Sequence, residues 1–334
     1  MLRLPPFAFV TPRTLEEAVE VLREGGAEAM VVAGGTDLYP NMKRRQFEPK
    51  IVVALSGIDG LRGVRGSPEE GLRIGPLTTL SEVSAHPMVR EHYFAFAKAA
   101  GLVSTPPLRN MGTIGGNLCV DPRCNYYNMP FPWRRAIGFC IKKDGDICLV
   151  APGSRRCWAL SSSDAAPVAM ALEAELSLVG PAGPRRLPAK DFYRDDGIDY
   201  LNKARDEILT EIRLPPANGY RTTYWKLRRR GSFDFPILGV AARLGLDARG
   251  RVHGAKLVLG AVSSKPLEVP QAAEFLDGKV PTEDDLEAVA NVAFNLARPM
   301  DNADGQLYWR KKLVKPYVKG ALSELLGRAT SPAS

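Results

Sequence analysis

The first part of the chain combines one helical pattern of hydrophobic residues with two short apolar runs. Between positions 15 and 22, apolar residues recur every three or four residues, which is the spacing of one helix face. Thr14 and Glu17 can form a capping box at the start of this helix. Residues 29–32 and 51–54 are continuous apolar runs, and they predict two buried strands.

The pattern then changes to shorter elements. Strands are predicted at 72–74 and 174–179, with a helix near 90–100. Between about 120 and 160 the sequence has little periodicity and is interrupted by prolines. A loop of this length without secondary structure of its own is normally functional, so we interpret it as an insertion.

Strands followed by helices are predicted in the last third. A stretch rich in proline, glycine and charge, 180–206, precedes them and indicates a domain boundary. The three strands and then the two helices are expected at 220–227, 236–246, 252–262, 282–296 and 305–326. This order of elements is typical of an α+β domain.

These patterns predict an α+β protein in three parts, because 334 residues exceed the size of one ordinary core. Residues 1–60 form an N-terminal α/β region. Residues 61–185 form a second region, which carries the insertion. Residues 186–334 form a C-terminal α+β domain with a three-stranded antiparallel sheet and helices.

Charge and hydropathy exclude two classes of function. The net charge of +8 is spread along the chain among 37 acidic residues, so a nucleic-acid partner is not expected. Basic pairs are usually solvated faces, although some could meet an anionic cofactor or an acidic electron donor. The chain shows neither a signal peptide nor a run of about 18 apolar residues. We therefore expect a cytoplasmic protein without a membrane span.

Two glycine loops are candidates for holding a phosphate group, Ala-Gly-Gly-Thr-Asp-Leu at 33–38 and Thr-Ile-Gly-Gly-Asn at 113–117. Paired glycines let the backbone approach a pyrophosphate closely and point several N–H groups at it. Each pair alone could equally be an ordinary turn. Neither loop fits the nicotinamide Rossmann fingerprint, and the P-loop sequence does not occur, so both of those classes are disfavoured.

Four of the five cysteines, Cys124, Cys140, Cys148 and Cys157, fall within the insertion. Four thiolates in one loop are the usual complement for a tetrahedral metal ion or an iron–sulfur cluster. A disulfide framework is the less favoured use in a chain expected to be cytoplasmic. Zinc ribbons show close Cys-x-x-Cys pairs, which do not occur here, so the spacing favours iron–sulfur and leaves zinc open. Cys119 is expected to be a packed free thiol.

No residue of the chain is predicted to be catalytic. The three histidines, His86, His92 and His253, have no nucleophile or metal-hydrolase constellation around them in the sequence. They are interpreted as surface or packing residues.

Several segments together resemble the FAD-binding (medium) subunit of the molybdenum hydroxylase family, which includes xanthine dehydrogenase and carbon monoxide dehydrogenase. The matching segments are 33–37, 74–80, 110–118, 163–167, 209–214 and 233–236. The resemblance therefore spans nearly the whole chain. It implies a PCMH-like fold in which FAD lies between the first two regions.

The resemblance also implies which residues hold FAD. The two glycine loops would cradle its pyrophosphate with Val31, Val32, Ala33, Gly34, Gly35, Thr36, Asp37 and Leu38, and with Thr113, Ile114, Gly115, Gly116 and Asn117. By the same carry-over, the remaining flavin contacts would come from Val103, Asn125, Asp164 and Lys226. Two structural roles stay open, Asp164 as a helix N-cap and Lys226 as a solvated strand residue.

The cysteine spacing resembles the β subunit of 4-hydroxybenzoyl-CoA reductase, in which four cysteines hold a [4Fe–4S] cluster. The flanking residues 121–128 and 133–135 look similar as well. This resemblance implies that Cys124, Cys140, Cys148 and Cys157 ligate such a cluster here.

The implied function is electron transfer in a molybdenum-dependent complex of the 4-hydroxybenzoyl-CoA reductase type. A ferredoxin-like donor would reduce the cluster, and electrons would pass through FAD to a [2Fe–2S] small subunit and a molybdopterin-binding large subunit for reductive dehydroxylation. A dimer of heterotrimers is implied. One alternative is a conventional hydroxylase subunit, of the xanthine, CO or aldehyde dehydrogenase kind, that passes electrons outward. Another is a zinc-stabilised scaffold whose glycine loops are turns.

Overall fold

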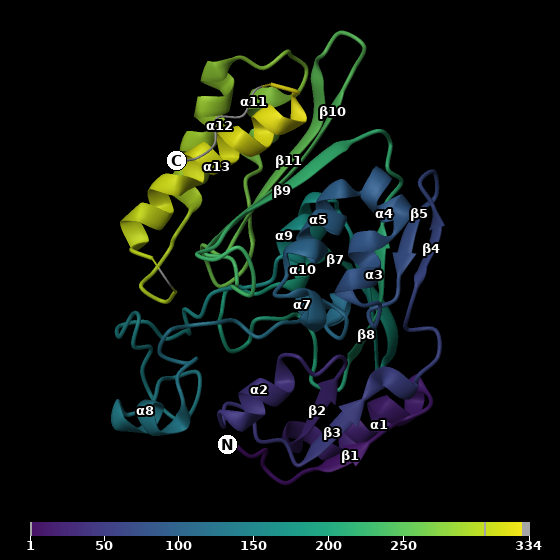
Figure 1. The fold of residues 1–334 in the computed structure, drawn as a ribbon, viewed down its shortest axis with the longest axis vertical. Coiled ribbons are helices and arrows are strands. Elements are labelled where there is room, and N and C mark those ends of the chain that lie inside the picture. Colours follow the sequence, from purple (N-terminus) through teal and green to yellow (C-terminus); the bar gives the residue numbers. More distant parts are fainter. Residues whose placement is uncertain (1, 304, 329–334) are drawn as a thin grey trace.

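The protein consists of three regions stacked along its long axis, each built around its own sheet (Figure 1). The structure is a computed structural model and describes residues 2–303 and 305–328. The α+β fold class is confirmed. No helix in these described ranges is long and apolar enough to cross a membrane.

The N-terminal region is a three-stranded parallel sheet in the order β1-β3-β2. Its elements are β1 Ala8–Val10, α1 Leu15–Gly25, a 3-10 turn Gly26–Glu28, β2 Ala29–Val32, α2 Leu38–Lys43, β3 Ile51–Ala54 and a 3-10 turn Leu55–Gly57. The predicted helix and both predicted strands are confirmed. Thr14 caps α1 by accepting from the Glu17 N–H, but the Glu17 carboxylate accepts from Arg13 N, so the reciprocal half of the capping box is not formed.

The central region is a five-stranded antiparallel sheet in the order β4-β5-β8-β6-β7. Its strands are β4 Val64–Ser67, β5 Gly71–Ile74, β6 Glu175–Gly180, β7 Gly183–Pro188 and β8 Ile208–Leu214. The sheet thus continues past residue 185, because the glycine- and proline-rich stretch that follows β6 is the turn and second strand of a hairpin.

Short helices pack beside this central sheet. They are α3 Leu80–Ala85, α4 Pro87–His92, α5 Phe94–Leu102, α6 Pro106–Arg109, α7 Ile114–Leu118, α9 Ala165–Ala171 and α10 Ala189–Phe192. The single helix predicted near 90–100 is two helices, which divide at Tyr93. The Tyr93 hydroxyl donates to Pro215 O at 2.7 Å, and its ring lies in the central core.

The C-terminal region is an antiparallel sheet in the order β12-β11-β10-β9 with helices on one face. Its elements are β9 Arg221–Leu227, β10 Leu238–Leu246, β11 Val252–Gly260, β12 Leu267–Glu268, α11 Gln271–Leu276, α12 Glu283–Leu296 and α13 Leu307–Leu325. The three predicted strands and two predicted helices are confirmed, and the short β12 makes the sheet four-stranded. Its other face packs on α5 and α9, so β10 is buried on both faces.

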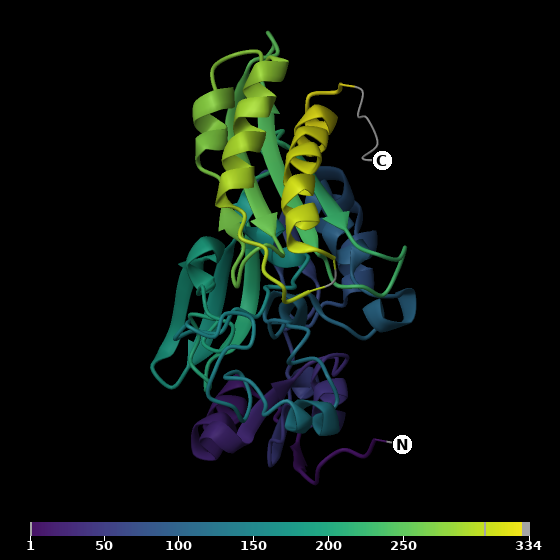
Figure 2. The same ribbon diagram turned by 90° about the vertical axis from the view of Figure 1, so that its left-hand side faces the viewer.

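The insertion leaves the central region as a long irregular segment beside α2 (Figures 1 and 2). Between α7 and α9, all of which is described, the single helix is α8 Phe131–Ala136. Arg123 and Leu160 exchange two backbone hydrogen bonds that close its base. The buried Arg134 donates to Arg44 O and Arg45 O at 3.0 Å and thereby ties the insertion to the N-terminal region.

Candidate functional site

The first predicted glycine loop meets, backbone to backbone, the turn that leads into the second. The first loop joins β2 to α2, whereas residues 113–117 form the N-cap and most of α7, and the turn before them joins α6 to α7. At Gly34 a Cβ atom would lie 1.8 Å from the carbonyl oxygen of Met111, so only glycine permits this approach. Gly35 has a φ of +70°, and a Cβ atom there would lie 2.3 Å from the Tyr39 ring. The contact brings two segments about 80 residues apart in sequence into one site.

The second loop is held from several sides. The Thr113 hydroxyl accepts from Gly116 N at 3.1 Å and caps α7. At Gly115 a Cβ atom would lie 2.4 Å from Pro76, which belongs to the loop after β5. The Asn117 side chain accepts from the Ser163 hydroxyl at 2.9 Å and from Ala165 N at 3.0 Å. These contacts fix the position of the loop.

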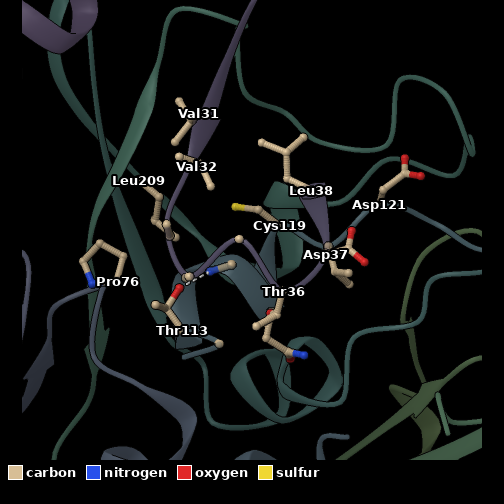
Figure 3. Close-up of a pocket in the computed structure, with 18 of the residues that line it drawn as sticks. Val31, Val32, Thr36, Asp37, Leu38, Pro76, Thr113, Cys119, Asp121 and Leu209 are labelled. Carbon is tan, nitrogen blue, oxygen red and sulfur yellow. Dashed lines mark hydrogen bonds between the residues drawn. The ribbon is translucent and has the colours of Figure 1, made fainter. Parts of the chain in front are cut away.

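A pocket of about 300 Å³ lies along these loops, between the N-terminal and central regions. Figure 3 shows Val31 and Val32 on β2 and Thr36, Asp37 and Leu38 beyond it, with Cys119 near the centre and Pro76 and Asp121 at opposite sides of the view. Apolar walls and converging backbone N–H groups are the usual composition of a cofactor pocket.

Most residues predicted to hold FAD line this pocket. They are Val31, Val32, Ala33, Gly34, Gly35, Thr36, Asp37, Leu38, Val103, Thr113, Gly115, Gly116 and Asn117. Ile114 is fully buried in the central core instead. Asn125, Asp164 and Lys226 are not among the described lining residues. Direct contact of each residue with FAD stays a prediction.

Asp164 and Lys226 form a buried ion pair, with 2.9 Å between Oδ2 and Nζ. Asp164 also accepts from the Tyr224 hydroxyl at 2.9 Å, and Lys226 donates to Leu102 O at 3.0 Å. Burial raises the pKa of Asp164 and lowers the pKa of Lys226, while their mutual attraction acts in the opposite direction for both. Asp164 does occupy the N-cap position of α9, but among the described contacts its side chain makes no capping hydrogen bond.

Several pocket residues were not predicted to hold FAD. Tyr200 and Lys203 come from the loop before β8 and carry no motif, and Asp121 lies in the segment 121–128, which was compared only for its place beside the cysteines. Leu209 and Phe235 also line the pocket, and both lie within segments that carry the family resemblance. The place of Tyr200 and Lys203 in the pocket is seen only in the folded structure, since no spacing rule links them to the glycine loops.

The four cysteines of the insertion line one small buried cavity. All are free thiols, and no disulfide occurs among the described residues. Burial raises the pKa of Cys124 to about 12 and that of Cys157 to about 11. The backbone N–H of Ala159 donates to Cys157 Sγ at 3.3 Å. Within the described ranges, no group of three or more histidine, cysteine or acidic side chains converges on a point where one metal ion could sit.

The donor set is chemically of the kind that either a zinc ion or an iron–sulfur cluster uses, since both can be held by four thiolates. A tetrahedral zinc site needs four sulfurs within about 2.3 Å of one point, whereas a cubane places its ligands around a larger volume. Four buried thiols line one cavity here, and one backbone N–H donates to a sulfur, so the residue types are those that a cluster needs. Cys119 lies apart from the set as a half-buried thiol packed on the central core, and burial raises its pKa to about 11.

Two family models match nearly the whole chain. Residues 5–217 match the FAD binding domain in molybdopterin dehydrogenase, and residues 222–325 match the CO dehydrogenase flavoprotein C-terminal domain. The two ranges meet at the start of β9, where the C-terminal sheet begins.

Individual relatives are similar over most of their length. The chain is 32% identical to the aldehyde oxidoreductase FAD-binding subunit PaoB of Escherichia coli (strain K12), over 83% of this chain and 87% of that one. It is 26% identical to the nicotinate dehydrogenase FAD-subunit of Eubacterium barkeri, over 96% of each chain. A solved structure of carbon monoxide dehydrogenase from Hydrogenophaga pseudoflava matches with a TM-score of 0.81 and 26% identity, over 98% of this chain and 99% of that one.

Proposed function

Because the chain belongs to the family of FAD-binding subunits of molybdenum hydroxylases, we propose that it carries electrons within a larger oxidoreductase complex. The observation that supports this most directly is the contact between the two glycine loops along one pocket. Bound FAD supplies a centre that accepts or donates one or two electrons. The protein's own part is to hold the pyrophosphate with backbone N–H groups and to shield the flavin with apolar walls.

The partners that we propose are a molybdopterin-binding large subunit and a small subunit with [2Fe–2S] centres. The carbon monoxide dehydrogenase relative from Hydrogenophaga pseudoflava is named a medium chain, and the Eubacterium barkeri relative is named an FAD-subunit. The organic substrate would then be bound and transformed on another polypeptide. A dimer of such three-subunit units is the assembly that we propose.

Outward electron flow is the first candidate for the direction of transfer. Relatives are named as dehydrogenases of nicotinate, carbon monoxide and glyceraldehyde. In an enzyme of this kind the substrate is oxidised, so electrons leave through FAD to an external acceptor. Reduction of the flavin by substrate, followed by reoxidation by an added acceptor, is the measurement that tests this candidate in the purified complex.

The cysteine cavity favours a second candidate, in which Cys124, Cys140, Cys148 and Cys157 hold a [4Fe–4S] cluster. A ferredoxin-like donor would then reduce the cluster and send electrons inward, as in a 4-hydroxybenzoyl-CoA reductase-type complex. The exposed face of α8 supports a docking role, because Trp133 is 41% exposed there beside the exposed Arg135. A basic surface with an aromatic side chain suits an acidic protein donor.

The first experiment is metal and flavin analysis of the anaerobically purified complex, with EPR before and after reduction by dithionite. One FAD per chain supports the family function, and its absence contradicts it. About four irons per chain beyond those of the small subunit, with a reduced [4Fe–4S] signal, support the second candidate. Zinc in their place contradicts that candidate and leaves the first intact.

Loss of one cavity thiol should lower the iron content without affecting FAD. Cys140→Ala removes one of the four sulfurs around the cavity, so the cluster should be lost or degraded and iron should fall by up to about four per chain. Cys119→Ala is the control for iron, since it removes the one cysteine outside the cavity; because Cys119 lines the FAD pocket, the FAD content of Cys140→Ala is compared with that of the unmodified protein. Equal iron in both variants would contradict the ligand assignment.

A further inference from the structure

The FAD pocket and the cysteine cavity share one wall. Asp121 and Tyr200 line the pocket on one side of it, while Lys142 and Tyr127 line or face the cavity on the other. Two residues of this wall are oppositely charged and buried. The Lys142 side chain is 5% exposed, and the Asp121 side chain is 8% exposed.

The ammonium group of Lys142 lies inside this wall. Its Nζ donates to Asp121 Oδ1 at 2.7 Å and to Gly197 O. The same Nζ lies 4.8 Å from the centre of the Tyr127 ring and 5.6 Å from the centre of the Tyr200 ring. The ammonium therefore has an acid on the flavin side and aromatic faces on both sides.

The ammonium is also close to a cysteine of the cavity. Gly197, whose carbonyl accepts from Lys142, donates its own N–H to Cys157 O at 2.9 Å. A Cβ atom at Gly197 would lie 2.6 Å from Cys157 Sγ. Lys142 is thus joined through Gly197 to the backbone of a cavity cysteine and through one ion pair to the flavin pocket.

Stability alone gives no reason for this pair. Burying two charges has a desolvation cost that offsets their attraction, so a buried ion pair is weak evidence for stabilisation. Asp121 Oδ2 has no hydrogen-bond partner among the described residues, which leaves Lys142 as the group that balances its charge. Among buried side chains the effective dielectric constant is low, so these two charges act strongly on a nearby cofactor that gains or loses an electron.

We propose that Lys142, held against Asp121 in the wall between the two cofactor sites, sets the reduction potential of a cluster bound by the four cysteines. The inference rests on the proposed function of the cysteine cavity. Reduction adds one electron and hence one negative charge to the cluster, and no bond in the protein forms or breaks. A fixed positive charge beside the cluster favours that state and raises its potential. The negative charge of Asp121 partly cancels that of Lys142, which limits the rise in the cluster's potential. Because Asp121 lines the FAD pocket, the pair also acts on the potential of the flavin.

The test is a redox titration of the purified complex with dithionite, which supplies the electron. EPR follows the cluster, and absorbance follows FAD. Lys142→Met removes the ammonium and leaves Asp121 unbalanced, so both cofactors become harder to reduce. At a fixed potential the ratio of reduced to oxidised cluster should fall at least tenfold, which is about 59 mV for a one-electron couple.

Lys143→Met is the matched control. Lys143 is the next residue, but its side chain is 28% exposed and pairs with Asp144 at 3.1 Å. Removal of a solvated charge should change the ratio by less than about twofold, because water screens it. Equal ratios in the two variants would overturn the inference.

If the Lys142→Met protein does not retain its cluster, the cluster potential is measured in Asp121→Asn instead. This variant leaves the ammonium unbalanced, so the cluster should become easier to reduce, opposite in sign to Lys142→Met. An unchanged cluster potential in Asp121→Asn overturns the inference. Absence of extra iron from the unmodified complex overturns the proposed cluster itself, and that result is distinct from a cluster that is present but insensitive to these charges.

Discussion

Gly34→Ala should abolish stable FAD binding. The new Cβ atom would lie 1.8 Å from Met111 O and 2.6 Å from the Met111 carbonyl carbon, so the two glycine loops must separate. Both neighbours are backbone atoms, which cannot rotate out of the way as a side chain could. Since both loops line the pocket, the expected loss of FAD affinity is on the order of 100-fold, or roughly 2.8 kcal/mol.

The measurement is the flavin content of the purified protein, together with a titration of the flavin-free protein with FAD. Gly231→Ala is the control, because nothing lies within 4 Å of a Cβ atom at that position and its φ is not positive. It should retain FAD at the level of the unmodified protein. Full flavin occupancy in Gly34→Ala would contradict the role given to the contact between the loops.

Asp164→Asn should destabilise the fold more than any other single loss of charge predicted here. The change leaves the Lys226 ammonium buried without its acid, and the Lys226 side chain is only 1% exposed. Removal of one partner of a buried ion pair typically costs about 3–5 kcal/mol. The pair joins α9 to β9, so the loss should appear as a lower urea midpoint for unfolding.

Two further variants isolate the cause. Asp164→Leu combined with Lys226→Met removes both charges and should recover most of the lost stability. Glu20→Gln breaks the exposed pair between Glu20 and Arg23, whose side chains are 52% and 54% exposed. That control should leave the urea midpoint of unfolding close to that of the unmodified protein, because an exposed ion pair contributes little to stability. A double variant as unstable as Asp164→Asn would show that packing, and not the unpaired charge, causes the loss.

The local patterns of the sequence predicted many of the longer regular elements. Apolar spacing is set by neighbours a few residues apart, so it located α1, α12 and α13 and the strands β2, β3, β9, β10 and β11. The elements that it missed depend on distant partners. The three-residue β1 is a strand because it pairs with β3, and β7 is a strand because it pairs with β6.

The candidate site divides in the same way. Paired glycines and clustered cysteines are visible in the sequence, because the chemistry of each requires those residue types. The sequence could not decide whether Asp164 caps a helix or contacts the flavin. The structure places it in an ion pair with Lys226, which is 62 positions away in the chain.

The sequence by itself therefore predicted the family, many of the longer elements in their order, and candidate residues for holding a phosphate or a cluster. Tertiary structure alone decided that Gly34 touches Met111, that four spaced thiols surround one cavity and that Asp121 meets Lys142 between two sites. The physical reason is the distance along the chain over which each kind of interaction acts. Backbone propensity and side-chain periodicity act over a few residues, whereas close packing and buried charge pairing join segments that only the folded chain brings together.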